Sequence, residues 1–178
     1  MIHGWGCQAT HYIPLITHLT THSLTPETPG DLYIAIDLPG HGQSPKSALP
    51  EPEKGGIPKL ILRLCAEVLD CFGLQHDQTE KVVYAHSMGI FMAFEIYSSL
   101  KNVISHVILL DGAHSGGSVP PERFDLEKIR EQAVQFKGGI QDQLDLYFGP
   151  RTLKEFERET RNGFATLDFE YALRMSYW

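Results

Sequence analysis

The 178-residue sequence contains no unbroken apolar run long enough to cross a bilayer, and its N-terminus lacks a basic segment followed by an apolar one. Cysteine is scarce: Cys7, Cys65 and Cys71 are an odd number without paired spacing. Neither Asn102 nor Asn162 begins a glycosylation sequon. These absences argue against a membrane-spanning protein and against a secreted, disulfide-stabilised fold. We therefore expect a cytoplasmic protein.

Charge and size narrow the expected partners further. The net charge is −7 and there is no stripe of basic residues, so nucleic acid and anionic membrane surfaces are not expected as main partners. With 42% apolar residues and the length of about one domain, the chain can bury a core, and disorder is not expected. We expect a folded protein that acts on a small-molecule substrate.

Three short apolar segments predict strands: LYIAID at 32–37, VVYA at 82–85 and ISHVILL at 104–110. Each is continuously apolar rather than alternating, which is typical of strands that are buried on both faces. Longer helical patterns separate the segments. The sequence therefore predicts a parallel sheet with βαβ connections.

Two helical patterns connect these strands. The first places its apolar residues on one face and ends at Gly73, which is suited to a C-terminal cap. That face consists of Ile61, Cys65, Val68 and Phe72. The second pattern, at 88–100, is apolar nearly all round, so we expect it to be deeply packed.

The pattern changes after Asp111. Residues 111–121 read as a loop, and residues 122–178 read as short helices of mixed charge with no strand. We interpret the helical part as a lid over the sheet. The predicted division is a core over residues 1–118 and a lid over residues 119–178.

Within the helical part, the sequence predicts two helix starts. One is the capping-box pattern from Thr152 to Glu155, and the other lies at Thr166. The second helix would present Leu167, Tyr171, Met175 and Trp178 on one face. Four aromatic residues fit either the core of the lid or a substrate pocket, and their helical spacing favours the core. They are Phe136, Phe148, Phe156 and Phe164.

The strand at 82–85 runs directly into Ala85-His86-Ser87-Met88-Gly89 and then into a helix. This is the pattern of a nucleophile elbow, in which small residues two before and two after the serine let strand and helix approach closely. Such a turn exposes the hydroxyl at the helix N-terminus, where backbone N–H groups and the helix dipole stabilise negative charge. The alternative is an ordinary strand–helix turn in which Ser87 caps the helix.

Two further motifs accompany the elbow. His3-Gly4-Trp5-Gly6 lies near the start, and Asp37-Leu-Pro-Gly-His-Gly-Gln-Ser44 begins as the strand at 32–37 ends. In order and spacing, the three motifs resemble signatures of the α/β-hydrolase superfamily, of the serine-nucleophile, AB hydrolase-1 type, over essentially the whole chain. The resemblance implies an α/β class and a partial α/β-hydrolase fold, with a mostly parallel sheet flanked by helices and a C-terminal helical lid.

The resemblance also implies roles for individual residues. Ser87 would be the nucleophile. The backbone N–H groups of Trp5 and Met88 would form the oxyanion hole. His41 and His86 lie inside the signatures, where family members carry histidine without using it as the base, and we interpret both as structural.

The sequence departs from the family pattern at its ends. Met1 and Ile2 leave almost no strand before the His-Gly-Trp-Gly motif, and the chain stops at Trp178, before the strands that would carry the catalytic histidine. We therefore expect a sequence that is truncated at both ends relative to the family, with the general base encoded beyond Trp178.

A serine hydroxyl needs a general base, and the base needs an orienting carboxylate. Asp111 is a candidate acid because it ends the strand expected beside the serine strand, and the alternative is that it caps the loop. His114 lies three residues further on and has little freedom to bridge acid and serine. His76 and His106 are placed in a connecting loop and a strand.

A metal site is the weaker interpretation of the histidines near the start. His11, His18 and His22 fall at i, i+7 and i+11 of the predicted first helix, and the last two have the spacing of a metal pair. However, no carboxylate or cysteine joins them locally, and Pro14 disturbs the helix. We predict no metal site and no cofactor.

Two classes of function remain open. The first is a serine hydrolase that cleaves an ester, thioester or related acyl bond of a small molecule through an acyl-enzyme on Ser87. The second is a non-catalytic protein, either a truncated hydrolase fragment or a hydrolase-like binding module that lacks the catalytic histidine. They differ in whether a histidine reaches Ser87.

Overall fold

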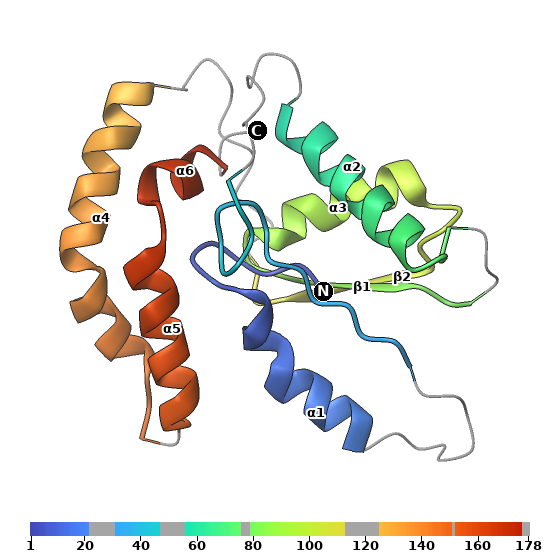
Figure 1. Cartoon of the computed structure of the whole chain (residues 1–178), viewed down its shortest axis with the longest axis horizontal. Coiled ribbons are helices and arrows are strands. Elements are labelled where there is room, and N and C mark those ends of the chain that lie inside the picture. Colours follow the sequence, from blue (N-terminus) through green and yellow to red (C-terminus); the bar gives the residue numbers. More distant parts are fainter. Residues whose placement is uncertain (22–30, 47–55, 76–78, 113–124, 151, 176–178) are drawn as a thin grey trace.

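The computed structural model describes residues 1–21, 31–46, 56–75, 79–112, 125–150 and 152–175. In chain order its elements are the 3-10 turn η1 (Ala9–Tyr12), helix α1 (Ile13–Thr21), helix α2 (Gly56–Cys71), strand β1 (Val82–His86), helix α3 (Gly89–Leu100), strand β2 (His106–Leu110), helix α4 (Leu126–Tyr147), helix α5 (Lys154–Thr166) and helix α6 (Phe169–Arg174). Helix α1 lies on one side of the strands, α2 and α3 lie on the other, and α4 to α6 stand together beside them (Figure 1). No helix in these ranges combines the length and the apolar character needed to cross a membrane.

The sheet is parallel, as predicted. β1 and β2 pair in register along their whole length. Ile2 adds an extended segment beside β1 through isolated parallel bridges to Ala85 and Ile36, and its carbonyl accepts from the His86 amide at 3.0 Å. The order across the sheet is therefore Ile36, Ile2, β1 and β2. The segment at 32–37 contributes an isolated bridge instead of the predicted strand.

Burial differs between the two strands. In β1, Val83 and Ala85 are buried, as expected of a strand with neighbours on both sides. In β2, Ile108 and Leu109 are exposed, so the prediction that the segment at 104–110 is buried on both faces is wrong. Among the described residues β2 pairs only with β1, although α3 also packs against it.

Helix α3 packs against both strands but buries only one side. The buried residues are Gly89, Ile90, Met92, Ala93 and Ile96. Phe94 and Tyr97 are 49% and 44% exposed, so the expectation of deep packing all round is wrong. An all-round apolar composition does not reveal which face a neighbouring layer covers.

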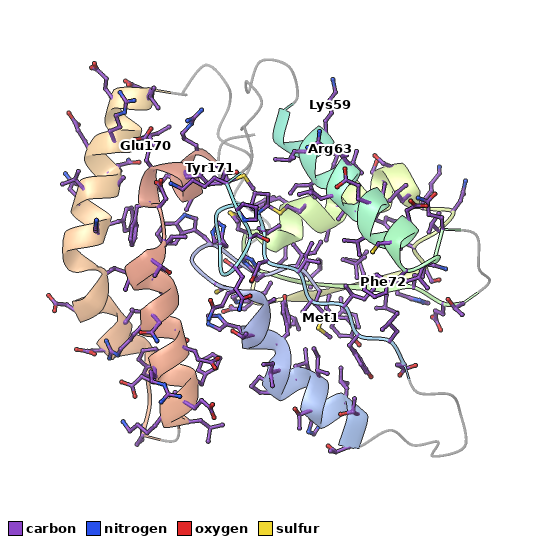
Figure 2. The ribbon with its side chains drawn as sticks, in the orientation of Figure 1. Met1, Lys59, Arg63, Phe72, Glu170 and Tyr171 are labelled. Atoms are coloured by element: carbon purple, nitrogen blue, oxygen red, sulfur yellow. The ribbon has the colours of Figure 1, made fainter. Side chains whose placement is uncertain are left out.

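Helix α2 ends as predicted. Gly73 has a φ of +66°, and its amide donates to the Asp70 carbonyl at 2.9 Å. The Leu74 amide donates to the Leu69 carbonyl at 2.7 Å, which completes a Schellman motif. Phe72 lies beyond the last helical residue and is half-exposed at this end of α2 (Figure 2), so it does not continue the buried face.

Helix α5 begins later than the capping-box pattern predicts. Its N-cap residue is Leu153, which has no side-chain capping bond. The Thr152 hydroxyl instead accepts from the Gly149 amide at 3.0 Å. The threonine therefore stabilises the preceding turn, and the capping-box prediction is wrong.

Helix α6 also begins later than predicted. Thr166 is the last residue of α5, and the N-cap of α6 is Asp168, whose carboxylate accepts from the Tyr171 amide at 3.0 Å. Leu167, Tyr171 and Met175 are buried, as the predicted face requires. Trp178 lies outside the described residues, as does the predicted boundary between residues 118 and 119.

Two clusters of buried side chains hold the molecule together. The first joins the sheet, α2, α3 and one side of α6, and the second lies among α4, α5 and the other side of α6. The first contains Ile2, Leu38, Ile61, Val83, Ala85, Met88, Ile90, Met92, Ala93, Ile96, Ile104, Tyr171 and Met175, and the second contains Ala133, Ile140, Leu144, Phe164, Leu167, Phe169 and Ala172. Tyr171 faces away from α4 and toward the sheet part of the molecule, whereas Glu170 faces α4 and pairs with Arg130 (Figure 2). Trp5 packs against both clusters.

The four aromatic residues of the helical part differ in burial: Phe164 is buried, and Phe136 is 37% exposed. Phe164 belongs to the second cluster, and Phe148 packs against that cluster beneath the Arg161 guanidinium, which lies 5.2 Å from the ring centroid. Phe156 stacks at a tilt on His11, with ring centroids 5.0 Å apart. These contacts favour the packing interpretation of the aromatic residues.

Candidate active site

Ser87 occupies the turn between β1 and α3. Its φ of +50° lies in the left-handed region, which a non-glycine residue adopts only when its surroundings impose it. The Ser87 amide donates to the Leu110 carbonyl at 3.1 Å, and the Ser87 carbonyl accepts from the Ile90 amide at 3.0 Å. The residue is exposed, and the N-cap of α3 is Met88. The structure therefore matches the elbow pattern and not the interpretation of Ser87 as a helix cap.

The small residues around Ser87 are required by space. Ala85 is completely buried in β1. A Cβ added to Gly89 would lie 2.6 Å from the carbonyl oxygen of Ile2 and 2.9 Å from that of His3. Because both obstacles are backbone atoms, a side chain at position 89 would push the first extended segment away from the elbow.

The turn that begins at Gly4 lies directly against the elbow. The Cys7 amide closes this turn by donating to the Gly4 carbonyl at 3.2 Å. A Cβ added to Gly4 would lie 2.9 Å from the Cβ of Ser87 and 2.9 Å from Nδ1 of His86. Trp5 follows Gly4, and Met88 follows Ser87, so the structure brings together the two chain segments whose amides the resemblance assigns to an oxyanion hole.

His3 fixes this turn through both ring nitrogens. Nδ1 donates to the Gly4 carbonyl at 2.8 Å, and Nε2 accepts from the Leu38 amide at 2.9 Å. A carbonyl only accepts and an amide only donates, so the imidazole carries its proton on Nδ1 and is neutral. The side chain is 1% exposed, and burial lowers its pKa to about 4 despite the bond to Gly4. His3 therefore joins the Gly4 turn to the segment that starts at Leu38.

Asp37 organises the next turn. Its carboxylate accepts from the Ala9 amide at 2.6 Å and from the Gln43 amide at 2.9 Å. Gly42, with a φ of +51°, lies so close that a Cβ there would overlap the carboxylate. The glycine of this motif is thus needed both for its backbone conformation and for space.

His41 lies inside this turn and beside His3. Its Nδ1 donates to the Pro39 carbonyl at 3.1 Å, and its ring centroid is 5.1 Å from that of His3. Burial lowers the pKa of His41 as it does that of His3. This hydrogen bond and the ring contact with His3 support the interpretation of His41 as a structural residue.

Asp111 occupies the same place after β2 that Ser87 occupies after β1. His86 and Leu110 are register partners, and each is followed by a residue in the left-handed region, with a φ of +48° at Asp111. Asp111 is exposed. Left-handed non-glycine residues cluster at functional sites, although aspartate tolerates this conformation better than most residues do.

Several of the candidate histidines have partners other than Ser87 in the structure. His11 shares a hydrogen bond of 3.2 Å with Thr160, and burial and the neighbouring His86 lower its pKa. His106 is the first residue of β2 and pairs with Glu80 at 2.8 Å. Ser87 bonds to Leu110 at the other end of this strand. His22, His76 and His114 lie outside the described residues.

The histidines near the start form no metal centre in the described part of the chain. His18 is exposed on α1, whereas His11 packs against α5. Across the described ranges, no three His, Cys, Asp or Glu side chains are grouped so that they could hold a metal ion.

Comparison with known proteins accounts for this architecture. A family model described as the alpha/beta hydrolase family matches residues 1–174. The chain belongs to the alpha/beta hydrolase family. The resemblance drawn from the three sequence motifs is thereby confirmed.

The structural comparison agrees with membership of the alpha/beta hydrolase family. An esterase from Exiguobacterium antarcticum has the same fold, with a TM-score of 0.71 at 15% sequence identity. The match covers 99% of this chain and 63% of the esterase, so the chain spans less than two thirds of the length of that protein. No curated protein matches the sequence.

Sequence reasoning missed several residues that shape this alpha/beta-hydrolase site. His3 and Leu38 both lie in sequence motifs, and that is the only sequence feature that points to the hydrogen bond between them. The position of Asp37 at the start of its motif does not by itself indicate that its carboxylate binds two backbone amides. Gly112 lies so close to Ile90 of α3 that a Cβ there would overlap the isoleucine side chain, and a glycine directly after Asp111 was the available signal.

Proposed function

We propose that this chain acts as a serine hydrolase on an ester, thioester or related acyl bond of a small molecule, with an acyl-enzyme formed on Ser87. The observation that carries the proposal is the constrained, exposed conformation of Ser87 against the Gly4 turn. Strain of this kind at an exposed nucleophile is hard to explain by folding alone.

In the proposed reaction the Ser87 Oγ attacks the acyl carbon while a base removes its proton. The amides of Trp5 and Met88 hold the resulting oxyanion. Collapse of the tetrahedral intermediate releases the alcohol or thiol, which takes the proton from the base, and water then cleaves the acyl-serine ester by the same steps. Asp111, which follows the register partner of His86, is the proposed acid that orients the base.

The general base is the component of the site that experiment has to identify. His3, His11, His41 and His106 are bound to other groups. His86 lies beside Gly4 and His114 follows Asp111 in the chain, so these two imidazoles are the ones to test against each other.

Labelling with a fluorophosphonate tests the proposal without knowledge of the substrate. An activated Ser87 Oγ forms a bond to phosphorus, fluoride leaves, and the base takes the serine proton. We expect labelling of the chain, loss of labelling in Ser87→Ala, and unchanged labelling in Ser98→Ala, which alters an exposed serine of α3. Circular dichroism of each variant establishes that it is folded.

Either outcome decides between the two classes of function. Labelling that depends on Ser87 supports the hydrolase, and its loss in His114→Gln or in His86→Gln identifies the base. If the folded chain is not labelled, the proposal of hydrolase activity for this chain is wrong, and the chain is non-catalytic: either a hydrolase fragment that lacks its base or a binding module built on the hydrolase fold.

A further inference from the structure

Trp5 lies between the elbow and the helical part of the molecule and contacts both. Its backbone belongs to the Gly4 turn beside Ser87, and its side chain extends into the helical part formed by α4, α5 and α6. The indole is the partly buried group that packs against both core clusters.

The indole contacts one aromatic ring from each of the three helices. The centroids lie 5.6 Å apart for Phe136 of α4, 6.0 Å for Phe164 of α5 and 5.8 Å for Phe169 of α6. We call these four side chains the aromatic anchor. Their tilted and edge-on arrangements are the favourable geometries for aromatic pairs. Phe164 and Phe169 are themselves buried and have little room to rearrange, whereas Phe136 is 37% exposed.

The backbone on either side of Trp5 is confined as tightly as the side chain. Gly4 lies against Ser87 and His86, where a Cβ would meet atoms at 2.9 Å. Gly6, with a φ of +69°, lies so close to the Phe164 ring that a Cβ there would overlap it. Gly4 and Gly6 flank Trp5, so the backbone of this residue is held between the elbow on one side and the Phe164 ring of α5 on the other.

Hydrogen bonding by the indole Nε1 does not explain why residue 5 is a tryptophan. This nitrogen is buried, and within the described part of the chain it has no acceptor. An unpaired buried N–H is costly, so the shape of the ring, and not its polar atom, accounts for a tryptophan in the anchor. A phenylalanine should therefore be able to replace it in part.

We propose that Trp5 is a positioning residue that sets the oxyanion amide according to the packing of α4 to α6 against its indole. The inference rests on the proposed serine hydrolase function, because it concerns the amide that would hold the oxyanion. When the helical part is packed on the indole, the Trp5 amide is held beside Ser87, and when that packing loosens, the amide loses its position.

The test measures the rate constant of fluorophosphonate labelling at saturating probe, together with the probe concentration at half-saturation. Trp5→Ala removes the indole and leaves the backbone amide. We expect its maximal labelling rate to fall by about 10-fold to 100-fold, with little change in half-saturation, because a displaced oxyanion donor weakens the transition state and not probe binding. Trp5→Phe keeps a ring in the anchor and should restore the rate to within about threefold of the wild type.

A second pair of variants approaches the anchor from the helical part. Phe169→Leu in α6 alters a ring that touches Trp5, whereas Phe156→Leu in α5 alters a ring that stacks on His11 instead. We expect Phe169→Leu to slow labelling by roughly 10-fold and Phe156→Leu to leave the rate nearly unchanged. Thermal unfolding measured for all four variants separates a loss of stability from a loss of rate in the folded chain.

The outcomes distinguish this inference from the proposal on which it rests. If the wild type is labelled at Ser87 and folded Trp5→Ala is labelled equally fast, the positioning role is wrong and the hydrolase proposal stands. Equal slowing by Phe169→Leu and Phe156→Leu also overturns the positioning role, because it indicates a general effect of stability. If the folded wild type is not labelled, the hydrolase proposal is wrong and the inference falls with it.

Discussion

Acid should destabilise this protein through His3. The imidazole is neutral and buried in the folded chain, with a pKa lowered from 6.5 to about 4 by desolvation. The unfolded chain therefore binds a proton at this site between these two values and the folded chain does not, so stability falls as the pH falls through that window. At 1.36 kcal/mol per pH unit, the full pKa shift corresponds to about 3 kcal/mol of folding stability. This stability is fully present above pH 6.5 and is lost by about pH 4.

The groups that face His3 change the size of its pKa shift but not its direction. The Gly4 carbonyl and the Asp37 carboxylate favour the protonated ring, whereas His41 and His11 disfavour it. His41 is buried as well, and its pKa is lowered for the same reason, so a proton taken up by either ring opposes protonation of the other.

Urea unfolding at a series of pH values from 7 to 4 measures the effect. His3→Gln carries a donor and an acceptor but does not titrate, so its free energy of unfolding should fall less steeply, by up to about 1.4 kcal/mol per pH unit. Ile96→Val is the matched control, because a buried non-titrating change should lower the whole profile without changing its slope. A His3→Gln profile that runs parallel to the wild type would refute the assignment of a neutral, buried His3.

The remaining predictions concern space and capping, and urea unfolding at pH 7 measures each. Gly89→Ala should cost about 1–3 kcal/mol because its Cβ meets two carbonyl oxygens. Gly138→Ala in α4 should instead stabilise the protein by up to about 1 kcal/mol, since nothing lies within 4 Å of its Cβ, and equal losses would contradict the steric argument. Asp168→Ala removes the N-cap of α6 and should cost about 1 kcal/mol, more than Lys46→Ala, which removes only the exposed ion pair with Asp168. A larger loss for the lysine variant would show that the ion pair, not the cap, stabilises α6.

The features that depend on local chemistry could be predicted from the sequence. The elbow required small residues at 85 and 89, and both prove to be limited by close packing. Gly73 was identified as a cap because only a residue that accepts a positive φ can end α2 in this way. A short apolar segment followed by a helical pattern was sufficient to locate β1, α3 and β2 within a few residues.

The features that depend on contacts with distant parts of the chain could not be predicted from the sequence. The exposure of Phe94 and Tyr97 is decided by which layer covers α3, and the sequence of the helix does not contain that information. Helix α5 starts late because the Thr152 hydroxyl accepts from the Gly149 amide instead of capping the helix. A local sequence pattern does not show which of these two hydrogen bonds is more favourable. The aromatic anchor joins Trp5 to residues more than a hundred positions away, so no spacing rule reveals it.

The left-handed backbone of Ser87 also has a consequence for protein engineering. Glycine adopts a positive φ without the steric penalty of a Cβ, so Ser87→Gly should raise the melting temperature even though it removes the only hydroxyl at the elbow. A sequence optimised solely for thermal stability on this backbone would therefore discard the serine. Any redesign that aims at a more robust protein must hold position 87 fixed and recover its stability elsewhere.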